Sequence, residues 1–341
     1  MKNAKFGFSN LQFAFCNLHF AISASGRSVE RWSCMAVVAE SSDVIESVTP
    51  ADQAGVAAAV RAAHDARQPI FPVGGRTSRD YGTPSPTAGH QLDLTGLSRI
   101  VDYTPRDMTI VVEAGVRMAD LAATLAAERH HLPIDVPRAA EATLGGVTAT
   151  NWTGPRRLGC GTMRDYVIGI HAVDGRGVAF KGGGRVVKNV AGYDFCKLLT
   201  GSLGTIGVIT QLALKVKPQP ERAATVVATC YELAIAETIL ERLVQLTATP
   251  TAIDLLVGDA WHEVVGGSPA ARPQPHLLLA VRVEGTDAEV DWLAERVQYE
   301  FWQGGATEAQ LLSVRDADRL WSQQVEFADR GATSEQDESP L

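Results

Sequence analysis

Glycine is concentrated in three short segments, and these constrain the fold more than any other feature of the chain. They span 72–82, 142–151 and 201–210. Glycine permits positive φ and a close approach of the backbone to a ligand or to another segment. In the first segment, paired glycines follow an expected strand and precede Thr77 and Ser78. Successive N–H groups in such a turn can bind an anion, although an ordinary glycine turn would have the same letters.

The second and third segments are less specific when each is taken alone. No large side chain interrupts 142–151, which suits a chain packed flat against a planar ligand but also a buried glycine turn. We expect a long loop over 142–161. The third segment precedes an expected strand at 205–216 instead of following one. It therefore fits neither the Rossmann fingerprint nor the phosphate-binding loop of the NTPases.

The hydrophobic pattern predicts an α+β fold in two parts, separated at Pro218 and Pro220. Before the prolines we expect helices at 54–66, 118–128 and 195–200, and strands at 69–73, 91–94, 100–103, 109–113, 167–173, 177–181 and 205–216. After them we expect strands at 224–231, 253–257 and 276–283, and helices at 233–247 and 287–302. This last order is typical of a ferredoxin-like split βαβ whose second half is incomplete.

Four regions follow from this pattern. Residues 41–218 form the first domain and 219–330 a partial cap domain, which looks truncated. Residues 1–40 are expected to be a disordered or spurious extension, with Met35 as an alternative start. The acidic tail, 331–341, is expected to be disordered.

Charge and cysteine usage exclude several classes of function. The net charge of −8 argues against general nucleic-acid binding, although local backbone dipoles can still hold a phosphate. The five cysteines are scattered and include no CxxC pair, so we expect no disulfide framework, iron–sulfur cluster or structural zinc. This usage favours a cytoplasmic setting. No apolar run approaches transmembrane length.

The order of the glycine segments is far more specific than any one of them. Together with Leu92–Ile100, Val112–Val116, Arg164-Asp165 and Gly184–Asp194, it resembles the FAD-binding domain of the vanillyl-alcohol oxidase / para-cresol methylhydroxylase (PCMH) superfamily. The resemblance covers about half of the chain, from Val48 to Pro218. Within the superfamily, the string GRVVKNVAGYD followed by GSLGT is similar to the FAD-binding (E) subunits of bacterial glycolate oxidases.

The resemblance implies a two-subdomain PCMH-type domain that binds FAD. The first segment would hold the pyrophosphate through backbone amides, the second would pass the pyrophosphate and the flavin, and the third would contact the adenosine end or the ring edge. Arg164 and Lys188 are candidates for a cation beside the reduced ring, although a salt-bridged arginine and an exposed lysine would be as typical. The expected FAD-binding residues are Pro72, Val73, Gly74, Gly75, Arg76, Thr77, Ser78, Pro137, Thr143, Leu144, Gly145, Gly146, Thr150, Asn151, Gly161, Arg164, Lys188, Gly204, Gly207, Val208 and Ile209.

Two departures from the family qualify this expectation. Covalent relatives carry a histidine directly after the paired glycines of the first segment, where this chain has Arg76, so we expect non-covalent FAD. Related dehydrogenases carry a metal-binding histidine motif in the cap. This cap has only His262 and His276 without such spacing, and we expect no metal. No residue is identified as catalytic.

The resemblance implies an FAD-binding subunit of a glycolate oxidase or dehydrogenase complex. It would oxidise glycolate, or a similar 2-hydroxy acid such as D-lactate, to the 2-oxo acid. Electrons would pass to a D-type flavoprotein subunit and an iron–sulfur subunit, and the complex would be cytoplasmic or, as an alternative, peripheral at the inner face of the membrane. The alternatives are a self-sufficient FAD oxidase of another hydroxy acid or alcohol, and a non-catalytic assembly subunit. The enolpyruvyl-sugar reductase of cell-wall synthesis shares the fold but fits the string at 188–194 poorly.

Overall fold

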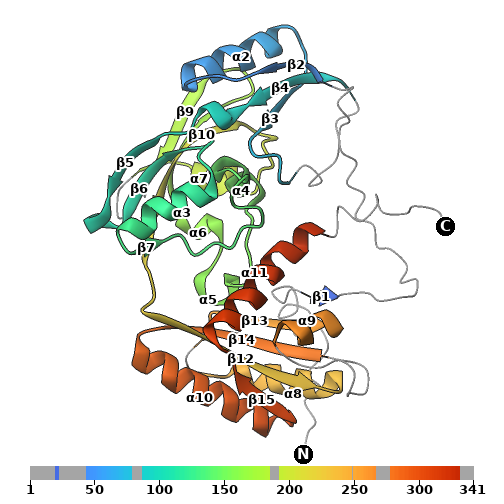
Figure 1. Cartoon of the computed structure of the whole chain (residues 1–341). Helices are drawn as coiled ribbons and strands as arrows, with labels where there is room; N and C mark the ends of the chain where they lie inside the picture. The colour runs from blue at the N-terminus through green and yellow to red at the C-terminus, as the bar shows by residue number, and fades with distance from the viewer. Residues whose placement is uncertain are drawn as a thin grey trace, which may run out of the picture. The chain divides into compact units, whose positions relative to one another are not determined.

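A computed structural model describes residues 20–22, 44–78, 87–184, 192–247, 249–265 and 277–330 (Figure 1). These residues fall into two compact units. The N-terminal unit comprises 44–153 and 162–219, and the cap unit comprises 20–22, 154–161 and 220–330. The segment 154–161, which the sequence assigned to the first domain, thus belongs with the cap. The tail 331–341 lies outside the described residues.

The N-terminal unit contains a small parallel sheet with a helix. The strand order is β2-β4-β3, and both pairings are parallel. Helix α2 buries Val56, Val60 and Ala63, which recur at helical spacing, and Asp52 caps its N-terminus by accepting from the N–H of Gly55. The elements are β2 (Val44–Val48), α2 (Gln53–Asp65), β3 (Ile70–Val73) and β4 (Gly89–Asp93).

A second, antiparallel sheet of the same unit has the order β5-β6-β10-β8-β9. Its core face packs against helices, with α3 contributing Leu121 and Leu125. The strands are β5 (Ile100–Thr104), β6 (Thr109–Glu113), β8 (Val167–Val173), β9 (Ala179–Gly183) and β10 (Val208–Lys215). The helices are α3 (Met118–Ala127), α4 (Leu144–Thr150), α6 (Met163–Tyr166) and α7 (Phe195–Leu199), and β7 (His130–His131) pairs with β11 (Lys217–Pro218).

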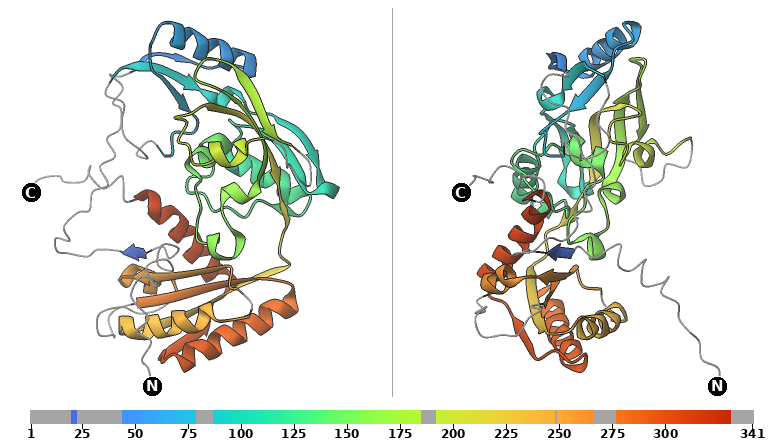
Figure 2. Two further views of the ribbon diagram at one scale, coloured as in Figure 1. Left: turned by 180° about the vertical axis from the view of Figure 1, so that it is seen from behind. Right: turned by 90° about the vertical axis from the view of Figure 1, so that its right-hand side faces the viewer.

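The cap unit is a five-stranded sheet with the order β1-β13-β14-β12-β15. Helices α8 and α10 cover one face, and α9 and α11 cover the other (Figure 2). The strands are β1 (Phe20–Ile22), β12 (Arg222–Cys230), β13 (Ala252–Val257), β14 (Leu277–Gly285) and β15 (Glu308–Leu311). The helices are α5 (Arg157–Cys160), α8 (Leu233–Val244), α9 (Asp259–Val264), α10 (Asp287–Gln303) and α11 (Val314–Arg330).

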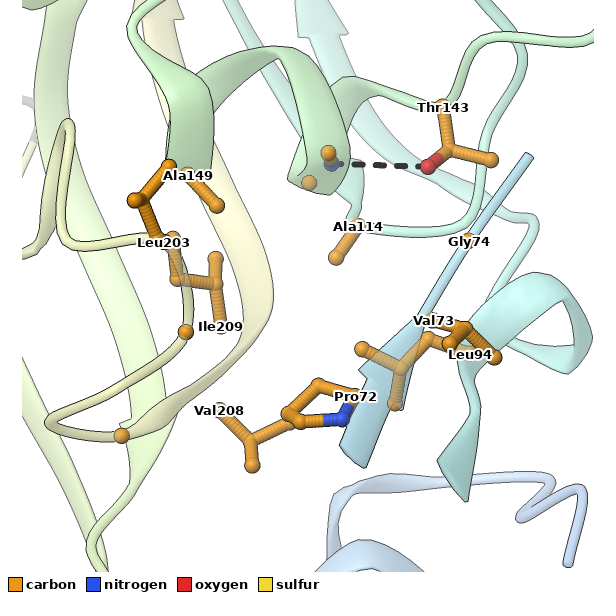
Figure 3. Close-up of a pocket in the computed structure, with 14 residues that line it drawn as sticks. Pro72, Val73, Gly74, Leu94, Ala114, Thr143, Ala149, Leu203, Val208 and Ile209 are labelled. Carbon is orange, nitrogen blue, oxygen red and sulfur yellow. Dashed lines mark hydrogen bonds between the residues drawn. The ribbon is translucent and has the colours of Figure 1, made fainter. Parts of the chain in front are cut away.

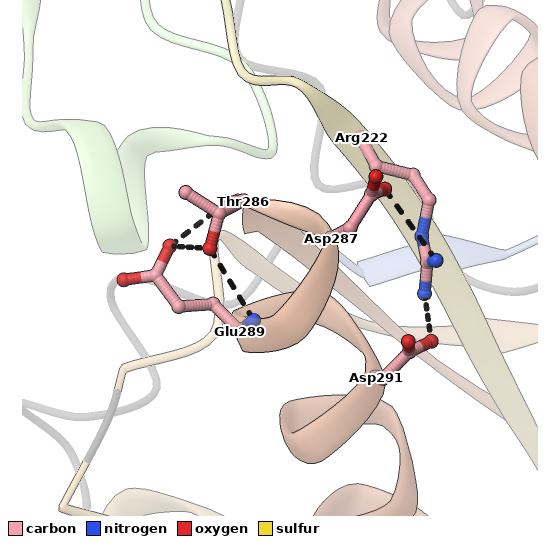
Figure 4. A network of polar contacts seen from close by, with 5 residues as sticks. All are labelled: Arg222, Thr286, Asp287, Glu289 and Asp291. Carbon is pink, nitrogen blue, oxygen red and sulfur yellow. Dashed lines mark hydrogen bonds and ion pairs between the residues drawn. The ribbon is translucent and has the colours of Figure 1, made fainter.

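The ferredoxin-like pattern of the cap is more complete than the sequence predicted. Strand β15 pairs antiparallel with β12 and supplies the fourth strand of the βαββαβ order. A capping box of Thr286 and Glu289 starts α10, and Arg222 at the start of β12 binds Asp287 and Asp291 (Figure 4). These contacts tie the second helix to the first strand.

Two expectations need correction. Within the expected disordered extension, Phe20–Ile22 forms β1, which pairs in parallel with β13; the rest of 1–40 lies outside the described residues. Instead of one long loop, 142–161 contains α4 and α5. Helix α4 forms despite two glycines because Thr143 caps it and Leu144 is fully buried.

No helix in the described part of the chain has both the length and the apolar character that a membrane span needs.

Candidate functional site

A pocket in the N-terminal unit brings the three glycine segments together (Figure 3). The end of β3 and the start of α4 form one side, and the turn before β10 forms another. None of the 14 lining residues has a titratable side chain. The lining is therefore suited to binding a ligand and supplies no general acid or base. They are Pro72, Val73, Gly74, Leu94, Ala114, Thr143, Gly145, Gly146, Ala149, Leu203, Gly204, Gly207, Val208 and Ile209.

Beside this pocket, the first segment presents a row of unpaired backbone donors. No hydrogen bond to another described group uses the N–H of Gly75, Arg76, Thr77 or Ser78. Arg76 has φ of 58°, in the left-handed region. An alternation of right- and left-handed residues points successive N–H groups to one side, and this arrangement binds anions. The segment therefore has the donors that a phosphate requires.

The paired glycines of the first segment are required by packing against the second segment. A Cβ at Gly74 would lie 2.0 Å from Oγ1 of Thr143, and one at Gly75 would lie 1.8 Å from the carbonyl oxygen of Glu141. Both distances are far below any real contact, and the second obstacle is backbone. Gly74 and Gly75 thus allow the first two segments to touch.

The second segment is the short helix α4, and its first amides already have partners. The N–H of Leu144 donates to Val116 and that of Gly145 donates to Ala114, at 2.9 and 2.7 Å. The N–H of Gly146 points to Oγ1 of Thr143 at 3.4 Å, a long contact (Figure 3). This helix therefore contributes a flat surface of small residues to the pocket, and its first amides are not free to donate to a ligand.

Gly146 differs from the other glycines of the first two segments. It is exposed, and a Cβ there would meet only Oγ1 of Thr143, at 3.3 Å. Gly145 beside it is packed on Ala114, whose Cβ would lie 2.8 Å from an added Cβ. Packing against backbone therefore explains Gly145, whereas an added Cβ at Gly146 would meet only one side-chain atom, in a tight contact.

The third segment docks onto the end of α4. The N–H of Gly201 donates to Thr148 at 3.0 Å, and that of Leu203 donates to Ala149 at 2.8 Å. Gly201, Leu203 and Gly204 all have positive φ, which makes a tight turn before β10. Within the described part of the chain, the N–H groups of Gly204 and Gly207 have no hydrogen-bond partner.

The pocket gathers ten of the expected residues and omits the others. Those that line it are Pro72, Val73, Gly74, Thr143, Gly145, Gly146, Gly204, Gly207, Val208 and Ile209. Those that do not are Gly75, Arg76, Thr77, Ser78, Pro137, Leu144, Thr150, Asn151, Gly161 and Arg164. Lys188 lies outside the described residues.

Several of the omitted residues have clear structural roles. Leu144 and Pro137 are buried, and Gly161 belongs to the cap unit. Oγ1 of Thr150 donates to the carbonyl of Gly146 inside α4. Asn151 ends α4 with φ of 50°, and its Oδ1 accepts from the N–H of Arg164 at 3.1 Å.

Four lining residues were missed from the sequence: Leu94, Ala114, Ala149 and Leu203. All four lie inside segments or strings that the sequence singled out, but ordinary alanines and leucines carry no chemical signal. Only the crossing of β4, β6 and the third segment brings them to the pocket.

The two buried cysteines of the described chain are not reactive nucleophiles. Burial raises the pKa of the Cys196 and Cys230 thiols to about 11, so both are neutral near pH 7. Among the described residues, no group of three or more His, Cys, Asp or Glu side chains could hold a metal ion. The side chain of His262 and all of His276 lie outside the description.

Comparisons with known proteins agree with this geometry. A family described as FAD binding domain matches residues 46–183. The glycolate oxidase subunit GlcE of Escherichia coli (strain K12) is 32% identical over 204 residues, which are 59% of this chain and 57% of that protein. The glycolate oxidase subunit GlcD of Bacillus subtilis (strain 168) is 30% identical over 190 residues, 56% of this chain and 40% of that protein. The chain thus spans about half the length of these curated relatives.

A solved structure extends the likeness to the fold. p-Cresol methylhydroxylase with bound substrate superposes with a TM-score of 0.66 at 15% identity, covering 83% of this chain and 62% of that one. At this identity the likeness concerns the fold alone. Residues 46–183 thus match the FAD binding domain family, in a chain whose fold is similar to that of p-cresol methylhydroxylase. Within that class, the curated relatives described above are subunits of glycolate oxidases.

Proposed function

We propose that this chain binds FAD non-covalently and is the FAD-binding subunit of a complex that oxidises a small 2-hydroxy acid, with glycolate as the first candidate. The supporting observation is the pocket of the N-terminal unit, where three glycine segments meet beside four N–H groups that have no hydrogen-bond partner among the described residues. The pocket lies in the unit that contains the matched FAD-binding region.

The residues present fit FAD. The unpaired amides of 75–78 are suited to the charged pyrophosphate, and the small-residue surface of α4 and the apolar side chains of Val208 and Ile209 are suited to flat rings. Gly146 is exposed and lines the pocket, so a bound group would lie against it. Arg76 stands where covalent relatives carry the linking histidine, and a guanidinium cannot form that bond.

The chemistry of the reaction comes from the flavin, which accepts the hydride equivalent that an alcohol loses when it becomes a carbonyl. This chain's own residues bind the cofactor, orient it and keep water from its apolar side. No catalytic base is assigned, because no titratable side chain lines the pocket. A partner that supplies one fits a multi-subunit complex, as the subunit names of the relatives suggest.

We propose that the partners are a D-type flavoprotein and an iron–sulfur subunit, and that the complex works in the cytoplasm or peripherally at the inner face of the membrane. The sequence has no CxxC pair, so electrons that reach the flavin need another acceptor. The acceptor could be oxygen or a partner protein; the names of the relatives favour the partner.

The first test is the visible spectrum of the purified full chain. We expect a yellow protein that releases intact FAD on acid precipitation. Flavin retained by the precipitate would refute non-covalent binding, and a well-folded chain that takes up no added FAD would refute the site.

The second test is dye reduction by glycolate and by D-lactate, first with the lone chain and then with co-expressed partner subunits. We expect turnover only with the partners. Equal turnover by the lone chain would instead favour a self-sufficient oxidase. Flavin binding without turnover in any combination would favour an assembly role.

A further inference from the structure

Arg76 occupies an unusual position in the first glycine segment. Its φ of 58° places it in the left-handed region, which a side chain with a Cβ rarely adopts. It is the second of the four residues whose N–H groups have no partner in the described part of the chain. The direction of these donors therefore depends on a backbone conformation that Arg76 does not favour by itself, and another contact must hold it.

That contact is an ion pair with Asp93. Nη2 of Arg76 donates to Oδ2 of Asp93 at 3.1 Å, and the Asp93 side chain is only 14% exposed. The other oxygen, Oδ1, accepts from the N–H and the hydroxyl of Thr95, at 3.0 and 2.6 Å. Asp93 ends β4 and pairs in register with Val73, the last residue of β3. The carboxylate is thus fixed at the base of the segment.

We propose that Arg76 is a positioning residue for the cofactor: its ion pair with Asp93 holds the amides of 75–78 in place before FAD binds. The inference rests on the proposed function of this pocket. It assigns Asp93, which is absent from the expected site and from the pocket lining, a part in cofactor affinity. Arg76 acts through the backbone of its own segment and needs no direct contact with the phosphates.

The Asp93→Asn variant separates this role from a direct charge effect. Asparagine keeps an oxygen for Thr95 but loses the charge that binds the guanidinium. If Arg76 positions the segment, Asp93→Asn weakens FAD binding even though it frees a positive charge near the proposed phosphate site. If Arg76 instead attracted the phosphates directly, the same variant would bind FAD as well as the wild type or better.

The experiment measures the Kd of FAD for the refolded apoprotein by flavin fluorescence, for wild type, Asp93→Asn, Arg76→Met, Arg76→Lys and the double variant Arg76→Met/Asp93→Asn. We expect each of the first two single variants to weaken binding about two- to fivefold, the range of a partly exposed ion pair. The double variant should lose no more than one single variant, and Arg76→Lys should recover part of the loss. Effects that multiply in the double variant, or an unchanged Kd in Asp93→Asn, would overturn the proposal.

Two controls keep the result interpretable. Arg138→Met removes an exposed ion pair with Glu141 in the same unit and should leave the Kd unchanged. The coupling between Arg76 and Asp93 is also measured from urea unfolding of the apoprotein, which needs no flavin. A wild type that binds no FAD would refute the proposed function while leaving this coupling readable; absence of the coupling would refute the positioning role itself.

Discussion

The first two glycine segments look alike in sequence but use glycine for opposite reasons. In the first, Gly75 cannot carry a Cβ because the carbonyl of Glu141 would lie 1.8 Å away. In the second, Gly146 is exposed, and an added Cβ would meet only Oγ1 of Thr143, at 3.3 Å. Gly75 is required by packing within the protein, whereas Gly146 lies exposed in the pocket lining.

The difference shows how to separate folding from binding within one site. A glycine whose added Cβ would strike backbone reports on chain packing, and its loss disrupts the fold whether or not a ligand exists. An exposed glycine that lines a pocket can instead be required by the group that the pocket binds. The two segments therefore predict two different kinds of failure for apparently similar substitutions.

The largest effect on stability and flavin content is expected for Gly75→Ala. Its Cβ must displace the backbone near Glu141, and overpacking of this kind costs about 3 kcal/mol or more. We expect a markedly lower urea midpoint for the N-terminal unit and no flavin in the purified protein. Far-UV circular dichroism and flavin content measure the two losses. A variant with wild-type stability would mean that the two segments do not touch as the structure has them.

Gly146→Val should instead lose flavin while keeping most of its stability. The matched variant Gly146→Ala should stay within about 1 kcal/mol of the wild type, because the gain in helix propensity of alanine over glycine is opposed by the 3.3 Å contact of its Cβ with Oγ1 of Thr143. The flavin-to-protein ratio and the urea midpoint are measured for both. Normal flavin occupancy in a folded Gly146→Val protein would move α4 away from the cofactor.

Two strands of apolar and β-branched residues were predicted to the residue, whereas the predicted bounds of β10, β12, β13 and β14 differ from the observed ones by one to three residues. The run at 109–113 forms β6 and the run at 167–173 forms β8, because their side chains fill the core whatever their neighbours. Strand β15, with the sequence EAQL, has no such pattern and exists because β12 offers it an edge. Short elements of this kind depend on a partner distant in the chain.

Prediction of the site from sequence is limited in the same way, by contacts between residues distant in the chain. The first segment's unpaired donors were predictable, since a strand that ends in paired glycines is a local signal. The helical state of α4 was not, because Gly145 and Gly146 disfavour a helix and it is supported by the Thr143 cap, the burial of Leu144 and the packing of Gly145 on Ala114. Asp93 carried no signal either, because its link to Arg76 joins residues 17 positions apart.

The smallest effect on stability is expected for a substitution near the C-terminal end of the second segment. Oδ1 of Asn151, which ends α4, is held by the N–H of Arg164 in α6, and α6 begins with a capping box of Thr162 and Asp165. The pKa of the Asp165 carboxyl lies below its ordinary value of 3.8, mainly because the N–H of Thr162 donates to it at 2.7 Å. The charged carboxylate therefore stabilises the folded chain.

Asp165→Asn should lower the free energy of unfolding at neutral pH by roughly 0.5–1 kcal/mol, the usual range for a lost cap, and leave flavin content unchanged. A carboxyl with a lowered pKa contributes its full stability above the unfolded pKa and loses it as pH falls through the folded pKa. The gap between wild type and variant should therefore close as the pH falls below about 4, as urea unfolding at several pH values would measure. A gap that stays constant with pH would contradict the charge-dependent cap. Lost flavin in this variant would show that the end of α4, and not only its open glycine, governs the cofactor.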